Sequence, residues 1–253
     1  MTQGDQSAGP NFKEVTPPNH NQGWVCLAVI AMAITLLAVV PAAAEDGLRL
    51  AYFQGLVGAA GFDEDQLTFA EPAPNDPGTD STNDLSTMPY LGIAGQFPLG
   101  RGETHVGIDA SLLVGWRSDD TSVSAGNGQA RIEIDSDLWL VDVAIGLYAQ
   151  TLLGERWRLY GAAGPMLLFG EYSDDTTEED LTVTPTTETE DSNSDSAFGV
   201  GGYAKLGLEY RLSGDAFMGI AVRGITTNLE FDQALESGNL TGLQGFITFT
   251  RAY

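Results

Sequence analysis

Residues 198–211 read FGVGGYAKLGLEYR, and this stretch decides the fold. Its successive positions alternate between two kinds of side chain. The first set is Phe198, Val200, Gly202, Ala204, Leu206, Leu208 and Tyr210, and the second is Gly199, Gly201, Tyr203, Lys205, Gly207, Glu209 and Arg211. Neighbouring side chains of a β-strand point to opposite faces. The stretch therefore predicts a strand with one apolar face and one charged face.

The same period of two recurs through residues 45–253, where no window of fifteen residues keeps an apolar helical stripe. We therefore predict an all-β protein. The predicted strands are 48–58, 87–97, 104–117, 131–149, 156–172, 197–211, 216–230 and 241–253. Pro165 lies in the middle of one of them and cannot donate a ladder hydrogen bond, so we predict a bulge at Gly164–Pro165.

The connections between these eight strands alternate in length. The short ones are 98–103, 150–155 and 212–215, and the long ones are 59–86, 118–130, 173–196 and 231–240. Long loops would then gather at one end and tight turns at the other, with both termini on the short-turn side. This layout is typical of an antiparallel up-and-down transmembrane β-barrel. Strands of about eleven residues, tilted by about 45°, can cross a bilayer of about 30 Å.

An uncharged apolar run precedes the strands. Residues 24–40 read WVCLAVIAMAITLLAVV, and three alanines follow at 42–44. An apolar run that ends in small residues indicates a secretory signal peptide. We therefore predict a cleaved signal peptide over 1–44 and an outer-membrane β-barrel domain over 45–253. The run is also near the shortest length that spans a membrane, so an uncleaved anchor is the alternative.

The composition excludes several classes of function. The 253 residues include 35 Asp and Glu against 11 Lys and Arg, which gives a formal net charge of −24. So acidic a chain has no basic surface for phosphates, and we predict no nucleic-acid partner. Cys26 is the single cysteine and lies in the predicted signal peptide. A mature chain without cysteine excludes thiol catalysis, disulfides and thiolate metal sites.

The charged face distinguishes two classes of barrel. A soluble, lipocalin-like periplasmic binding barrel would turn its apolar face inward and its polar face to water. The charged positions of the predicted strands carry both signs in similar number, which suits a narrow lumen filled by paired charges. The membrane barrel is therefore favoured, and the soluble barrel is the alternative. The predicted lumenal charge network is structural and consists of Arg49, Asp109, Arg117, Asp142, Arg158, Lys205, Glu209, Arg211 and Arg223.

Several segments of the sequence resemble those of a known protein family. Residues 159–165 read LYGAAGP, residues 199–212 read GVGGYAKLGLEYRL, and the chain ends in an aromatic residue. With the leader and the eight amphipathic strands, they resemble small bacterial outer-membrane β-barrel proteins of the OmpA/OmpW type. The resemblance implies the bacterial outer membrane as location, and outer-membrane lipid, lipopolysaccharide and the barrel-assembly machinery as partners. The residues matching the family's C-terminal assembly signal are Ile247, Phe249 and Tyr253, while Arg251 departs from it.

Acidic residues are concentrated in two predicted loops. Loop 59–86 contains seven carboxylates and loop 173–196 contains nine, without any Lys or Arg. Such loops are either solvated surface or a region that gathers cations through weak Ca²⁺ or Mg²⁺ binding, and a saline habitat would also explain the charge. The segment 191–195 matches the opening of a calcium loop, but Ser196 and Gly202 stand where glycine and glutamate are required. We predict no EF-hand, no metal site and no cofactor.

Enzymatic motifs are weak. His105 is the one histidine of residues 45–253 and shares a predicted strand face with Asp109 and Ser111. These two residues are roughly 13 and 20 Å along the strand, too far for hydrogen bonds to His105. We predict a non-enzymatic envelope protein that acts in envelope structure, surface interaction or cation capture. The alternatives are a narrow cation-preferring channel and a lipid-modifying barrel enzyme that uses His105.

Overall fold

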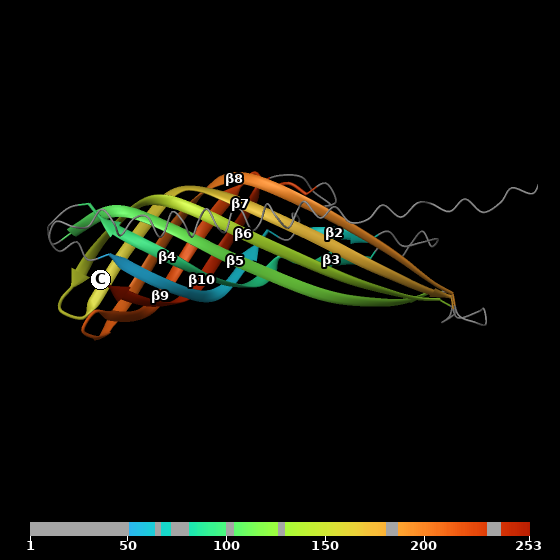
Figure 1. The fold of residues 1–253 in the computed structure, drawn as a ribbon, viewed down its shortest axis with the longest axis horizontal. Helices are drawn as coiled ribbons and strands as arrows, with labels where there is room; N and C mark the ends of the chain where they lie inside the picture. The colour runs from blue at the N-terminus through green and yellow to red at the C-terminus, as the bar shows by residue number, and fades with distance from the viewer. Residues whose placement is uncertain are drawn as a thin grey trace, which may run out of the picture. The chain divides into compact units, whose positions relative to one another are not determined.

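Eight long strands close into one antiparallel barrel (Figure 1). The computed structural model describes residues 51–63, 67–71, 81–99, 104–125, 130–180, 187–231 and 239–253. The barrel strands are β1 (Tyr52–Phe62), β4 (Thr87–Pro98), β5 (Thr104–Ala125), β6 (Ala130–Leu153), β7 (Trp157–Asp180), β8 (Thr187–Ser213), β9 (Ala216–Thr227) and β10 (Leu240–Ala252). Each strand pairs with its sequence neighbour in the barrel, and β1 closes the ring against β10. The predicted all-β, eight-stranded barrel is confirmed, and the predicted signal peptide lies outside the described residues.

A separate small hairpin lies within the segment predicted to be the first long loop. It consists of β2 (Thr68–Glu71) and β3 (Ser81–Asp84), which pair with each other and not with the barrel. Among the described residues, no helix has the length and apolar character needed to cross a membrane.

The apolar faces of the strands point outward. Val57, Leu206 and Ile220 keep 61%, 61% and 62% of their surface exposed, although they are large hydrophobic residues. The intervening positions point into the barrel, where Lys205 and Glu209 are 5% and 0% exposed. A lipocalin-like barrel has the opposite arrangement, so the soluble alternative is wrong for this chain. An apolar outer surface around a polar interior is the arrangement that a bilayer requires.

Tight turns and the C-terminus mark one end of the barrel, which we call the short-turn end. Gly154 and Gly214 open the β6–β7 and β8–β9 turns with φ angles of 69° and 50°. Only glycine adopts such angles without strain, which explains both residues. Ala51 and Tyr253 exchange backbone hydrogen bonds of 2.9 and 2.8 Å and so close the ring at this end.

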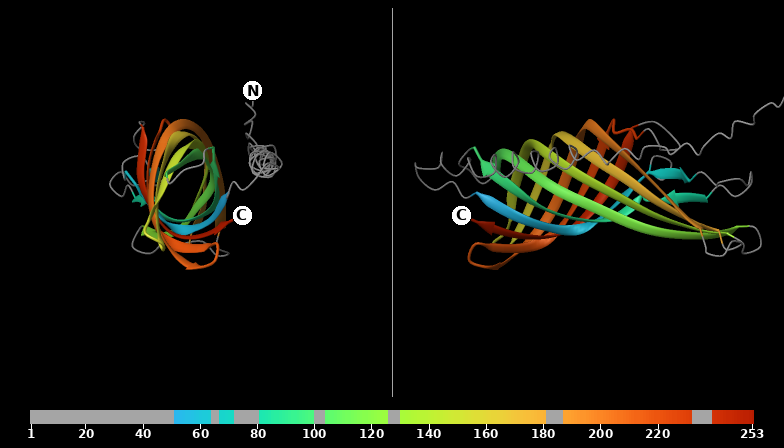
Figure 2. Two further views of the ribbon diagram at one scale, coloured as in Figure 1. Left: turned by 90° about the vertical axis from the view of Figure 1, so that its left-hand side faces the viewer. Right: turned by 45° about the vertical axis from the view of Figure 1, so that its right-hand side comes forward.

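The opposite end is formed by the continuing hairpins of β5–β8 (Figure 2). The predicted loops 118–130 and 173–196 are wrong for most of their length, because β5 and β6 pair until Ala125 opposite Ala130 and β7 and β8 until Asp180 opposite Thr187. Hydrophobic alternation stops where both faces of a sheet meet water. Backbone pairing continues there without that sequence signal.

These continuations form a four-stranded sheet of their own. β4 pairs with β5 only up to Tyr90 opposite Gly115, and β9 pairs with β8 only from Gly201 opposite Thr227. Beyond Tyr90 on one side, and beyond Asn228, which still bonds Val200, on the other, the described strands leave β5 and β8 without an outer neighbour. We call the resulting unit the projecting sheet, which consists of residues 116–125, 130–139, 171–180 and 187–196. Ten residues per strand correspond to about 33 Å of length.

The bulge predicted at Gly164–Pro165 is wrong. Ala144 lies opposite Met166 and Leu147 opposite Ala163, so the same number of residues separates the pairs on both strands. The β6–β7 ladder is interrupted at the proline without an inserted residue. The missing N–H of proline removes a hydrogen bond locally, and the unbroken register on the β8 side holds Pro165 opposite Gly202.

Candidate functional site

A buried ion pair lies in the half of the barrel interior that is nearer the short-turn end. Arg158 on β7 lies directly opposite Glu209 on β8, and Nη1 of the arginine is 2.7 Å from Oε2 of the glutamate. Neither side chain has any exposed surface. Thr248 and Thr250 of β10 donate to the second carboxylate oxygen at 2.9 and 2.6 Å, and Gln54 donates to it at 2.9 Å. The carboxylate is therefore fully satisfied, as a buried charge requires.

A second ion pair crosses the lumen from β8 to β5. Nζ of Lys205 donates to Oδ1 and Oδ2 of Asp109 at 2.7 and 3.0 Å, and the Tyr203 hydroxyl donates to Oδ2 at 2.8 Å. Gln96 of β4 connects the two pairs, because its amide nitrogen donates to Asp109 at 3.1 Å and its oxygen accepts from Arg158. Residues of six strands, β1, β4, β5, β7, β8 and β10, thus share one hydrogen-bond network.

A third pair lies further toward the hairpins. Nη1 of Arg223 on β9 donates to Oδ2 of Asp142 on β6 and to the amide oxygen of Gln244 on β10, both at 2.9 Å. The guanidinium also lies 4.8 Å from the centre of the Tyr203 ring, a cation–π distance. Tyr203 therefore contacts both this pair and the Lys205–Asp109 pair.

An apolar layer fills the interior beyond the third pair. It includes residues of the barrel wall, such as Leu138 and Leu168, and residues from outside the barrel strands. Leu67 and Leu85 come from the β2–β3 region and have no exposed surface, and Leu229 and Phe231 follow β9. Charged and apolar layers together occupy the lumen, as expected for a barrel of eight strands.

The structure brings six of the nine predicted network residues together in these three pairs. Arg117 lies instead at the base of the projecting sheet, where it donates to the Thr87 carbonyl at 2.7 Å and lies 3.7 Å from Asp119. Arg211 lies at the short-turn end, with its guanidinium 5.2 Å from the Phe217 ring centre. Arg49 is outside the described residues.

Neutral polar residues of the network were missed by sequence reasoning. Each occupies an inward-facing position of its strand, opposite in parity to the exposed apolar residues, and this parity is the signal that would have found it. The missed residues are Gln54, Gln96, Gln150, Gln244, Thr248 and Thr250.

The C-terminal residues predicted as an assembly signal face outward. Ile247, Phe249 and Tyr253 are 49%, 54% and 63% exposed, and the Tyr253 ring contacts Phe53 edge-on at 5.6 Å. Their outward position is compatible with recognition from the lipid side. Their role in assembly stays a prediction.

The geometry offers little for catalysis or metal binding. His105 lies opposite Gln150 near the short-turn end, and Asp109 is held by Lys205. Within the described part of the chain, no three His, Cys, Asp or Glu residues are grouped to hold a metal ion. The segment 191–195, compared above with a calcium loop, is part of the extended strand β8.

The projecting sheet carries a charge very different from that of the lumen. Its sequence contains fifteen Asp and Glu but two Arg. The acidic positions are Asp119, Asp120, Glu133, Asp135, Asp137, Glu171, Asp174, Asp175, Glu178, Glu179, Asp180, Glu188, Glu190, Asp191 and Asp195. Asp135 lies opposite Asp175, and opposite positions of an antiparallel pair share a face. Like charges therefore meet across strands of this sheet.

One protein family matches most of the chain. The family described as "Outer membrane protein beta-barrel domain" matches residues 29–243. No curated protein matches the sequence. Among solved structures, the attachment invasion locus protein Ail of Yersinia pestis is similar at 10% identity over 81% of this chain and 100% of that one, with a TM-score of 0.40. Neisserial surface protein A has 7% identity over 80% and 97%, with a TM-score of 0.39. The outer membrane protease OmpT from Escherichia coli has 9% identity over 82% and 99%, with a TM-score of 0.34.

Proposed function

Because the chain belongs to the outer membrane protein β-barrel domain family, we propose that it is a non-enzymatic surface protein whose barrel anchors an acidic interaction sheet. Its location is the bacterial outer membrane. In this orientation the short turns face the periplasm and the long hairpins face the outside. The projecting sheet then lies outside the cell, where it can meet partners.

One observation carries the proposal. An unbroken β-register forms a four-stranded sheet beyond the barrel, and this sheet contains fifteen acidic residues and two arginines. A field of one sign attracts cationic partners and acts over about 8 Å at physiological salt. The strand edges at 116–125 and 187–196 also present backbone groups that can pair with an added strand. We therefore propose cationic, extended polypeptide segments as the partners, with weak Ca²⁺ or Mg²⁺ binding as an accompanying effect.

The experiment compares two proteins in vesicles. The first is the full chain, and the second lacks 118–137 and 173–194, each replaced by an Asn-Gly turn that joins strand positions already opposite each other. The probe is a lysine-rich peptide, with a glutamate-rich peptide of the same length as control. We expect the lysine-rich peptide to bind the full chain, and to bind less as salt rises.

The control variant keeps the sheet but replaces its acidic residues by Asn and Gln. We expect it to lose binding as the shortened chain does, because charge provides the attraction. Equal binding of the lysine-rich peptide to the full and the shortened chain would overturn the proposal.

Ion conduction through the barrel is not part of the proposed function. The lumen is occupied by the Arg158–Glu209 and Lys205–Asp109 pairs, by the apolar layer and by aromatic rings. We therefore expect no unitary conductance in planar-bilayer recordings of the purified chain. A stable cation-selective current would favour the narrow channel instead.

Lipid modification is also not part of the proposed function. His105 lies toward the short-turn end, whereas lipid A belongs to the outer leaflet. We expect cells that express the chain and cells that express His105→Ala to contain the same lipid A species by mass spectrometry. A modified lipid A that disappears with the variant would establish an enzyme.

A further inference from the structure

A stacked pair of tryptophans lies on the outer surface where the barrel ends and the projecting sheet begins. Trp116 on β5 is directly opposite Trp139 on β6, with ring centres 6.2 Å apart and ring planes inclined by 27°. The two side chains keep 37% and 50% of their surface exposed. The next outward row toward the short-turn end is apolar and contains Phe169 and Phe198, whereas the row on the other side contains Asp137. The pair therefore marks the boundary between the apolar and the acidic part of the outer surface.

Two carboxylates flank this pair on the same face. Glu171 of β7 lies directly opposite Trp139, so the two side chains share a face and their Cβ atoms are about 4.5–5.5 Å apart. Asp137 precedes Trp139 by two positions on β6, which places it on the outer face as well. Neither carboxylate forms an ion pair with another residue that the structure describes. Arg117, next to Trp116 in the chain, has inward parity and donates to the Thr87 carbonyl.

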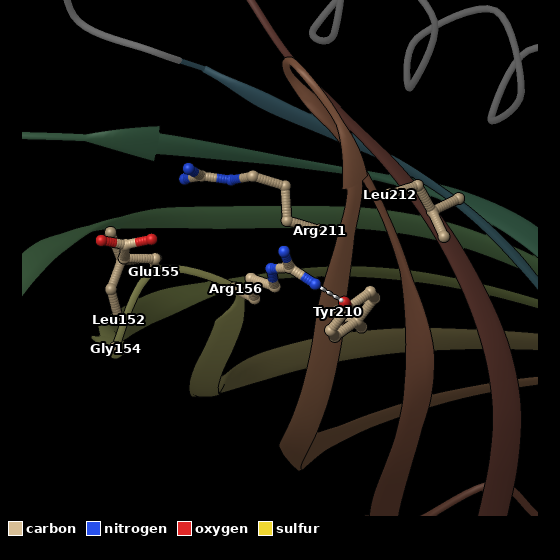
Figure 3. Close-up of a pocket in the computed structure, with 7 residues that line it drawn as sticks. All are labelled: Leu152, Gly154, Glu155, Arg156, Tyr210, Arg211 and Leu212. Carbon is tan, nitrogen blue, oxygen red and sulfur yellow. Dashed lines mark hydrogen bonds between the residues drawn. The ribbon is translucent and has the colours of Figure 1, made fainter.

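Aromatic rings at the short-turn end, by contrast, meet cations of the chain itself. The Arg251 guanidinium lies 5.2 Å from the centre of the Tyr253 ring. Nη1 of Arg156 donates to the Tyr210 hydroxyl at 2.8 Å, as Figure 3 shows. Among the described residues, no Lys or Arg lies over either ring of the tryptophan pair. Tryptophan attracts a cation more strongly than the other aromatic residues do, so the pair can receive a cation from outside the chain.

The tryptophan pair also lies beside a free strand edge. β4 pairs with β5 only up to Tyr90 opposite Gly115, so Trp116 is the first residue of β5 beyond that pairing. An extended segment that pairs with β5 within 116–125 would place one side chain directly opposite Ser118 on the outer face. That side chain is the diagonal neighbour of Trp116, about 7–8 Å away. A long lysine or arginine side chain can span this distance.

We propose that Trp116 and Trp139, with Glu171 and Asp137, bind a lysine or arginine side chain of an extended polypeptide partner. The indole rings provide cation–π contacts, and the carboxylates provide charge-assisted hydrogen bonds. This inference rests on the proposed function, because it names the residues that hold a cationic strand at a fixed position on the projecting sheet. The other acidic residues contribute attraction over distance, whereas this pair determines which position of the partner must be cationic.

Binding of a labelled lysine-rich peptide to the full chain tests this site. The chain is placed in phosphatidylcholine vesicles, whose neutral surface does not attract the peptide, and fluorescence anisotropy of the label gives the affinity. Trp116→Leu/Trp139→Leu removes both rings but keeps apolar side chains at the boundary, and Glu171→Gln removes the adjacent carboxylate. The matched control is Asp175→Asn, which removes one charge from the same face of β7, four residues and roughly 13 Å along the strand. Each variant is first checked for folding by its mobility on gels with and without boiling.

We expect the double tryptophan variant to bind the peptide about tenfold more weakly than the unaltered chain, because both cation–π contacts are lost. Glu171→Gln should weaken binding about threefold, and Asp175→Asn should weaken it less. Unchanged affinity in the double variant would mean that the tryptophans only contact the bilayer, and would overturn this inference while the proposed function stands. Equal losses in Glu171→Gln and Asp175→Asn would also overturn it, because only the total charge of the sheet would then matter. A peptide that does not bind the unaltered chain would instead contradict the proposed function.

Tryptophan emission gives an independent measurement of the same contact. Trp24→Phe/Trp157→Phe leaves Trp116 and Trp139 as the only tryptophans of the chain. We expect the lysine-rich peptide to change their emission, and a peptide with acetylated lysines to leave it unchanged, because acetylation removes the positive charge. Peptide binding without any change in this emission would place the partner elsewhere on the sheet.

Discussion

The barrel interior and the projecting sheet share the strands β5–β8, yet their charged side chains are arranged in opposite ways. In the interior, three carboxylates face three cations, and each pair meets at 2.7–2.9 Å. In the projecting sheet, fifteen acidic residues accompany two arginines. A charge in a low-dielectric interior is costly unless it is paired and hydrogen-bonded, whereas a charge in water is solvated and screened. Both regions have the same backbone hydrogen-bond ladder. Exposure to water therefore determines whether a charged side chain needs a partner of opposite charge.

The largest difference between the two regions should appear when one cation is removed from each. Arg158→Ala leaves Glu209 buried without its positive partner, which should lower the free energy of unfolding by about 3–5 kcal/mol. Arg117→Ala breaks a pair whose side chains are 34% and 39% exposed, and should cost about 0–1 kcal/mol. Urea unfolding of both variants in detergent gives the comparison. Equal losses would mean that the interior is as well hydrated as the sheet.

Interior packing should give the next largest effect. A Cβ at Gly207 would overlap the Tyr160 ring, whereas a Cβ at Gly245 meets nothing within 4 Å. Gly207→Ala should therefore destabilise the barrel by about 1–3 kcal/mol through overpacking. Gly245→Ala, on an outward position of β10, is the matched control and should have little effect. The same urea titration distinguishes them, and two equal midpoints would contradict a tightly filled lumen.

Charge balance in the projecting sheet should have a smaller and opposite effect. Asp175→Lys places a cation opposite Asp135 and removes a like-charge contact, so it should stabilise the sheet by about 0.2–1 kcal/mol. Slower amide hydrogen exchange in residues 130–139 and 171–180 would report this gain. The gain should shrink at high salt, because exposed charges are screened. A gain that does not depend on salt would assign the effect to β-propensity instead.

The smallest effect is expected from removing the projecting sheet altogether. The shortened chain keeps all three buried pairs and the β1–β10 closure. Its barrel should therefore keep the heat-dependent gel mobility and a urea midpoint close to that of the full chain. A barrel that no longer folds would show that the two regions are one cooperative unit.

Sequence reasoning predicted the barrel well because its signal is local. Alternation places Lys205 and Glu209 on one face, the balance of charge signs on that face assigns it to the interior, and both residues are buried there. Arg117 and Arg211 have the same inward parity but lie at the two ends of the barrel, since parity gives the face of a strand and not its depth. The burial of Leu67 and Leu85 could not be predicted, because isolated apolar residues outside the barrel strands have no periodicity.

The sequence by itself determined the all-β class, the eight barrel strands and the face of the strand on which each residue lies, because the alternation with a period of two is visible in neighbouring residues. Only the tertiary structure decided which charges meet. Asp109 and Lys205 are 96 residues apart and belong to strands separated by two others in the ring, yet their atoms lie 2.7 Å apart. Closure of the sheet brings them across the lumen. Such a contact depends on the register of every strand between them, which no local pattern encodes.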